Sequence, residues 1–244
     1  MYVSRVYPSE GVSAFGWDGL VFEMAGGLSL KGLLKRFLEE NLNPISEVES
    51  KTTGPAGGGR DSALVIDASG SMSDEDWPPS RLDAAKEASS VFCTRLAQED
   101  PDARVTIIGY GSEARVLCPL TAAGEVAILR DAIHRIDYLG GTNIRAGLEK
   151  TAQLLRRSHG ACDVVLLSDG HNTERSPKPV AADLKKRAAI SCVGIGGSPE
   201  AVDEELLKWI ASEHPDGSKR YRWIGDKERL VRHFHQLAGR ITRG

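Results

Sequence analysis

Three features are scarce or missing in this sequence of 244 residues, and each absence narrows what the protein can be. No apolar run approaches the ~18 residues that identify a membrane-spanning helix, and the first residues lack the basic stretch and apolar core of a secretory signal. The four cysteines are widely separated and form no CxxC pair, which favours buried thiols in a reducing compartment over zinc ligands or disulfides. We therefore expect a cytoplasmic protein with no membrane association.

An excess of basic residues is also missing. Lys and Arg number 31 against 34 Asp and Glu, which gives a formal net charge of -3. Proteins that bind nucleic acids usually carry a basic excess to neutralise phosphates, so no nucleic-acid partner is expected. Hydrophobic residues make up 41% and charged residues 27%, which is typical of a folded globular protein with a sizeable core.

Aromatic residues are few, and they are concentrated near the N-terminus. Six of them lie in the first 40 positions, namely Tyr2, Tyr7, Phe15, Trp17, Phe22 and Phe37. An Asp18-Gly19 pair between two apolar runs predicts a β-hairpin, and apolar residues at helical spacing over 30–38 predict an amphipathic helix. We interpret residues 1–42 as an extension that docks either on the rest of the chain or on a partner, and 43–60 as a flexible linker rich in Gly, Pro, Ser and Thr.

Short apolar runs alternate with amphipathic helical patterns throughout residues 61–244. The run at 62–69 is almost wholly apolar, as expected of a central strand that is covered on both faces, and the run at 163–169 also predicts a strand. Two further runs joined by the short turn Gly111–Glu113 predict one antiparallel pair. The pattern predicts an α/β fold, a Rossmann-like three-layer sandwich with a mostly parallel central sheet, one antiparallel strand and helices on both faces. Ser80 begins a helical pattern and resembles a capping box with Asp83.

Ligands in such folds bind at the carboxyl ends of the strands, near the point where the strand order reverses. Asp67, Ser69 and Ser71 follow the first predicted strand, and Asp169 ends another. Thr142 follows a glycine pair just before a predicted helix. These two carboxylates and three hydroxyls are hard oxygen ligands, which suit Mg²⁺ or Mn²⁺, with Ca²⁺ less favoured, and not zinc.

The D-x-S-G-S segment, the Thr after a Gly pair and the S-D-G at a strand end together resemble the metal-ion-dependent adhesion site (MIDAS) of von Willebrand factor type A (vWA) domains. The resemblance covers roughly three quarters of the chain. It implies that Ser69 and Ser71 bind the metal directly and that Thr142 binds directly or through water. Asp67 and Asp169 would lie beside the metal, largely through water. Neutral inner ligands leave the cation electrophilic, so its remaining position attracts an anionic oxygen.

The resemblance implies a non-enzymatic, intracellular interaction module, an adaptor that binds a Glu or Asp carboxylate of a protein partner through Mg²⁺. Relatives of this kind act in multi-protein machines that include AAA+ ATPases. One alternative is a Mg²⁺-dependent phosphohydrolase, but such an enzyme needs an acid/base carboxylate two positions after its nucleophile, and Ser69 stands there. The other is a cell-surface adhesion domain, against which the unpaired cysteines and the missing signal argue.

Three residues and one short segment near the predicted site admit two interpretations each. Thr142 can be a helix N-cap as well as a metal ligand. Trp77 is either an exposed anchor for a partner or packs its own loop. The acidic residues 74–76 form a solvated loop or select partners by charge. His171 either lies at the rim of the site or is an ordinary surface histidine.

Overall fold

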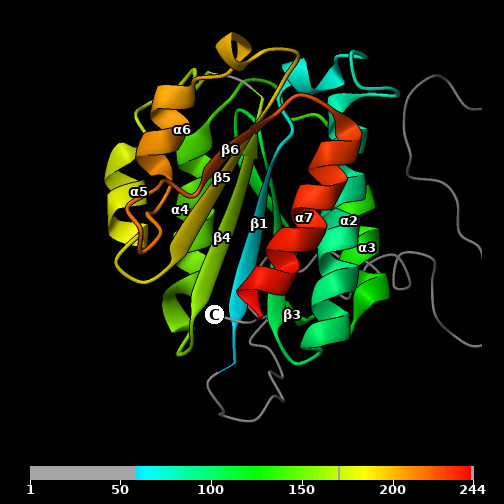
Figure 1. The fold of residues 1–244 in the computed structure, drawn as a ribbon, viewed down its shortest axis with the longest axis vertical. Coiled ribbons are helices and arrows are strands. Elements are labelled where there is room, and N and C mark those ends of the chain that lie inside the picture. Colours follow the sequence, from blue (N-terminus) through cyan, green and yellow to red (C-terminus); the bar gives the residue numbers. More distant parts are fainter. Residues whose placement is uncertain (1–58, 170, 243–244) are drawn as a thin grey trace, which may run out of the picture. The chain divides into compact units, whose positions relative to one another are not determined.

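The computed structural model describes residues 59–169 and 171–242 (Figure 1). The hairpin and helix predicted within 1–42, and nearly all of the predicted linker 43–60, lie outside the described residues. Within the part that is described, no helix is long and apolar enough to cross a membrane.

Six strands form one sheet in the order β3-β2-β1-β4-β5-β6. They are β1 (Asp61–Asp67), β2 (Arg104–Tyr110), β3 (Ala114–Ala122), β4 (Cys162–Ser168), β5 (Ala189–Ile195) and β6 (Tyr221–Ile224). Strand β3 runs antiparallel to β2, whereas the other neighbours pair in parallel. The mostly parallel sheet with one antiparallel strand is thus confirmed.

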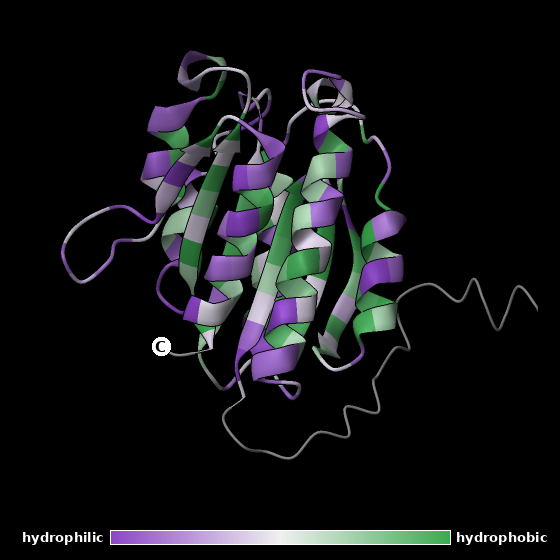
Figure 2. Cartoon of the chain, turned by 45° about the vertical axis from the view of Figure 1, so that its right-hand side comes forward, coloured by the Kyte–Doolittle hydropathy of each residue, from purple (hydrophilic) through white to green (hydrophobic). Residues whose placement is uncertain are grey.

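Helices cover both faces of this sheet (Figure 1). On one face lie α2 (Arg81–Glu99), α3 (Val126–His134) and α7 (Lys227–Ile241), and on the other α4 (Ile144–Leu154), α5 (Lys178–Leu184) and α6 (Glu204–Ile210). Short 3-10 turns are η1 (Gly70–Ser73), η2 (Leu155–Arg157) and η3 (Pro199–Ala201). Strands β1 and β4 are buried along their whole length, as expected of strands covered on both sides. Figure 2 shows these apolar strands between helices whose outer faces are hydrophilic.

Four of the α-helices in the described residues, α2, α4, α6 and α7, begin at a residue whose side chain caps the first turn. The Ser80 hydroxyl accepts a hydrogen bond from the Asp83 N–H at 3.1 Å and donates one to the Asp83 carboxylate at 2.6 Å. Ser80 thus caps the helix with Asp83 as its partner, although the Asp83 carboxylate meets the Ser80 hydroxyl instead of the backbone N–H that a full capping box uses. The alternative N-cap role of Thr142 is wrong, because Asn143 accepts the N–H of Ala146 at 3.0 Å and caps α4 one residue later. An Asn side chain is as good a cap as Thr or better, and here it is the one that reaches the helix.

Two apolar cores fill the spaces between the sheet and its two helical layers. In one of them Phe92 of α2 meets Phe234 of α7 edge to face, with ring centroids 6.4 Å apart. Trp77 is only 4% exposed and packs in the same core, so its interpretation as an exposed anchor is wrong. All four cysteines are buried free thiols, as predicted.

Truncation of Phe92 tests how far the α2–α7 contact holds this domain together. We expect Phe92→Ala to lower the free energy of unfolding by about 3–5 kcal/mol, because it removes a fully buried ring and leaves a cavity. Ile128→Ala is the control, since Ile128 is 49% exposed and should change stability by no more than about 0.5 kcal/mol. Urea unfolding measures both, and equal losses would contradict the packing described.

Candidate metal site

The predicted site residues gather at the carboxyl ends of β1 and β4. These strands are neighbours in the sheet, while β2 pairs with the other side of β1. The chain therefore changes direction across the sheet between β1 and β4, which is where open α/β sheets bind ligands. Asp67 ends β1, and Asp169 follows directly after β4.

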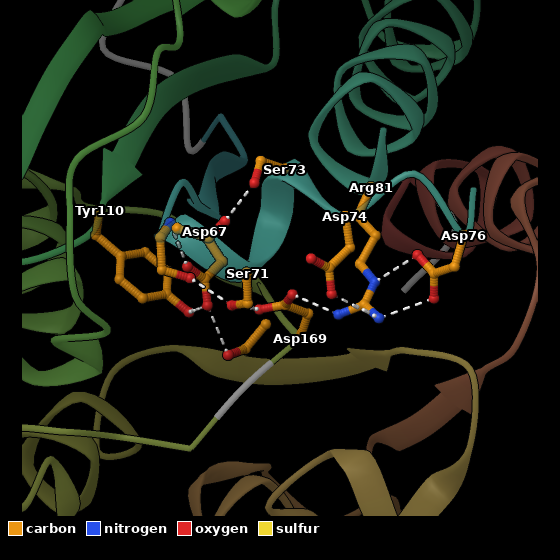
Figure 3. A network of polar contacts seen from close by, with 11 residues as sticks. Asp67, Ser71, Ser73, Asp74, Asp76, Arg81, Tyr110 and Asp169 are labelled. Carbon is orange, nitrogen blue, oxygen red and sulfur yellow. Dashed lines mark hydrogen bonds and ion pairs between the residues drawn. The ribbon is translucent and has the colours of Figure 1, made fainter. Parts of the chain in front are cut away.

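Three oxygen atoms from two distant segments meet there. The hydroxyl oxygens of Ser69 and Ser71 lie 3.2 Å apart, and the Ser71 hydroxyl donates to Oδ1 of Asp169 at 2.8 Å (Figure 3). Adjacent ligands of an octahedral Mg²⁺ at 2.0–2.1 Å would be separated by about 2.9 Å. The separation of the two hydroxyl oxygens is close to that value, so they fit neighbouring positions around a small divalent cation, with the Asp169 carboxylate directly beside them.

Asp67 lies fully buried beneath this cluster, and both of its carboxylate oxygens accept hydrogen bonds. Oδ1 accepts the N–H of Ser69 at 2.9 Å, while Oδ2 accepts the hydroxyls of Ser168 at 2.8 Å and Tyr110 at 3.2 Å (Figure 3). Burial, followed by the charge of Asp169, raises the pKa of Asp67 to about 6. A carboxylate in this situation is stabilised by an added positive charge.

Arg81, which the sequence motifs do not identify, supplies one such charge. Its Nη1 donates to Oδ2 of Asp169 at 2.9 Å, and its Nε and Nη2 each donate to the carboxylate of Asp76 at 2.8 Å (Figure 3). Nη2 also lies 3.3 Å from the Asp74 carboxylate. Burial raises the pKa of Asp169, and the hydrogen bonds from Arg81 and Ser71 oppose that rise.

One sequence signal could have pointed to Arg81. It is the first residue of α2, and a cation is unfavourable at a helix N-terminus, where the peptide dipoles present positive charge. An Arg at this position therefore indicates that a nearby carboxylate offsets the unfavourable interaction. The segment before it, residues 74–76, supplies two of the three that Arg81 contacts, so this acidic segment is more than a solvated loop.

A backbone hydrogen bond joins the loop that carries Thr142 to the segment 67–73, which carries Asp67, Ser69 and Ser71. The Gly70 N–H donates to the Gly140 carbonyl at 2.7 Å, and the Thr142 N–H donates to the Thr173 hydroxyl at 3.1 Å. Gly140 has φ +84°, a conformation in which glycine is strongly favoured. The Thr142 hydroxyl makes no hydrogen bond within residues 59–169 and 171–242, so its role as a ligand stays a prediction.

The structure thus joins four of the five predicted site residues in one network, namely Asp67, Ser69, Ser71 and Asp169. Thr142 is the fifth. His171, for which a place at the rim was one interpretation, is not part of this network. Its side chain is 65% exposed, and its Nδ1 lies 3.8 Å from an Asp203 carboxylate oxygen, as expected of a surface histidine. No group of three or more His, Cys, Asp or Glu side chains that could together hold a metal ion occurs in the described part of the chain. A metal at this site would be held by hydroxyls, two carboxylates and water, which is the chemistry that Mg²⁺ prefers.

Comparison with known proteins identifies the domain. Residues 63–171 match the family model of the von Willebrand factor type A domain, and the chain therefore carries a vWA domain. A UPF0353 protein of Mycolicibacterium gilvum is 32% identical over 174 residues, which are 61% of this chain and 51% of that protein. The chain thus spans about half the length of the curated relatives it matches.

Two solved structures illustrate the likeness in fold. The vWF domain of the type V pili tip protein Mfa5 from Porphyromonas gingivalis has a TM-score of 0.66 at 14% identity, covering 78% of this chain and 97% of that one. Proximal thread matrix protein 1 from the mussel byssus has a TM-score of 0.63 at 23% identity, covering 76% of this chain and 46% of that one, and its structure has a zinc-occupied MIDAS motif. These likenesses establish the fold.

Removal of the Arg81 charge tests the electrostatics of the site. In EDTA, we expect Arg81→Gln to lower the free energy of unfolding by about 3 kcal/mol, because it leaves the buried Asp169 carboxylate without its cation. Arg130→Gln on the exposed face of α3 is the matched control and should cost no more than about 0.5 kcal/mol. If urea unfolding gives the same small change for both variants, Arg81 does not stabilise Asp169.

Proposed function

We propose that this chain is an intracellular, non-catalytic adaptor that binds Mg²⁺ at the ends of β1 and β4 and, through that ion, an acidic side chain of a protein partner. The observation that carries the proposal is the oxygen cluster of Ser69, Ser71 and Asp169, with separations of 3.2 and 2.8 Å. These separations and the all-oxygen donor set suit a small, hard divalent cation.

The bound ion would supply an electrophilic position that attracts a carboxylate oxygen. Ser69 and Ser71 would ligate it through their hydroxyls, and Thr142 would do so directly or through water. The two acidic residues would contribute largely through water, because hydrogen bonds already occupy them. Three donors engage Asp67, and Ser71 and Arg81 engage Asp169. With its negative neighbours partly neutralised, the cation would keep enough positive charge to attract an anion despite the net charge of -3.

Two features support the other parts of the proposal. Ser69, which is 1% exposed, stands where a phosphohydrolase of the related type would need its acid/base carboxylate, so the site lacks the pair for that reaction. The four buried free thiols suit a reducing compartment. A multi-protein machine with an AAA+ ATPase is the setting that the family resemblance implies for the partner.

Metal binding is testable on the whole chain by thermal unfolding. Mg²⁺ or Mn²⁺ at tenfold its dissociation constant should stabilise the protein by about 1.4 kcal/mol, which is about 3–6 °C for a domain of this size. Ser71→Ala should reduce or abolish the shift, because it removes a ligand hydroxyl.

Ser73→Ala is the matched control for that experiment. Ser73 lies two residues from Ser71 in the same turn, is exposed and donates to the Gly70 carbonyl at 2.7 Å (Figure 3). Its loss should leave the metal-induced shift unchanged. A shift of equal size in wild type and Ser71→Ala would place the metal somewhere else.

Partner capture tests the second half of the proposal. Immobilised full-length protein should retain a partner from a lysate of its source in Mg²⁺ and release it in EDTA, since the ion would form the bridge. An excess of acetate should also release the partner, whereas acetamide should not, because only acetate offers a charged carboxylate. Capture by Ser73→Ala but not by Ser71→Ala would support the bridge, and capture that survives EDTA would contradict it.

A further inference from the structure

A cavity lies at the opposite end of the sheet from the candidate metal site. Its volume is about 550 Å³, and it is lined by the first residues of β4 and β5, by the segment that precedes β6 and by the C-terminal half of α7. In Figure 1 this end of the sheet is the lower one, where α7 ends. No residue of the metal-site network lines this cavity.

The charge of the lining contrasts with the charge of the chain. Five cationic side chains line the cavity, namely Arg60, Lys219, Arg220, Arg222 and Arg240, against the single carboxylate of Asp163. The chain as a whole has a net charge of -3. A concave site with one predominant sign of charge concentrates its field and attracts ligands of the opposite sign.

Three of these five cations form ion pairs within the described part of the protein, and two do not. Asp163 is shared, with one oxygen 3.2 Å from Arg60 Nη1 and the other 3.8 Å from Arg220 Nη1. Lys219 pairs with Glu213 at 2.6 Å. Within residues 59–169 and 171–242, Arg222 and Arg240 have no ion pair, so two full positive charges at the cavity have no local counter-charge.

Two buried polar atoms at the cavity also have no partner. Nε of Arg220 and Nδ1 of His233 are shielded from solvent and make no hydrogen bond within the described residues. Burial, and then the charges of Arg222 and Arg240, lowers the pKa of His233 to about 4, and all three residues line the cavity. Buried polar groups without partners are costly, and a bound ligand is one explanation for them.

We propose that this cavity binds a small anion of the phosphate class that carries at least two negative charges. Guanidinium groups match phosphate oxygens in shape and donate to them in pairs, and a cavity of this volume accommodates a small molecule. A concave pocket of this volume, on a chain with a net charge of -3, favours a small ligand over a nucleic acid. The proposal does not depend on the metal site.

Calorimetric titration of the full chain with pyrophosphate, inorganic phosphate and a nucleoside diphosphate tests this inference. The titrations are made in EDTA, so that no anion can bind through a metal. We expect saturable binding of one anion per chain, with pyrophosphate tighter than phosphate because it carries more charge. If the nucleoside diphosphate binds more tightly than pyrophosphate, the natural ligand is a phosphate ester, and the reverse order indicates an inorganic anion; both support the proposal.

The double variant Arg222→Gln/Arg240→Gln should weaken pyrophosphate binding roughly tenfold or more, because it removes charge-assisted hydrogen bonds. Both side chains are exposed and without ion pairs in the described region, so the melting temperature of the unliganded variant should match that of wild type. Arg130→Gln and Ser71→Ala should bind pyrophosphate as wild type does. No saturable binding, an unchanged dissociation constant in the double variant, or tighter binding of a short single-stranded oligonucleotide would overturn the proposal.

Discussion

Two carboxylates buried side by side, at the ends of adjacent strands, are the constraint on which the rest of the site depends. Asp67 and Asp169 are 0% and 2% exposed, and both burial and their mutual repulsion disfavour their charged forms. The surrounding loops offset this cost through hydroxyl and backbone N–H donors to Asp67 and through Arg81 on Asp169. A divalent cation would act in the same direction, so the need for positive charge there and the metal binding that we propose would have one physical origin.

The two ends of the sheet also differ in the charges that they carry. The carboxyl ends of the strands hold the buried carboxylates, together with an acidic segment bound to Arg81. At the amino ends, five cationic side chains and a single carboxylate line the cavity. A modest net charge of -3 therefore conceals two regions of opposite sign, and each favours a different class of ligand.

Much of the fold could be predicted because periodicity and burial are properties of short segments. The apolar run of β1 indicated a central strand, the run of β4 indicated a further strand, and the turn at Gly111–Glu113 indicated the antiparallel pair. Helix ends were harder, because neighbouring residues compete to cap them. Asn143 caps α4 where Thr142 was an alternative.

By itself, the sequence determined which oxygen atoms are available for a metal and that they follow strand ends, since both are set by residue type and local spacing. Only the tertiary structure decided which of them meet, because Ser71 and Asp169 are 98 positions apart. It also revealed Arg81, which contacts Asp169 across 88 positions, and the basic cavity, whose lining comes from several separate segments. Charges that are distant along the chain interact only once folding brings them together, and no local pattern records that distance.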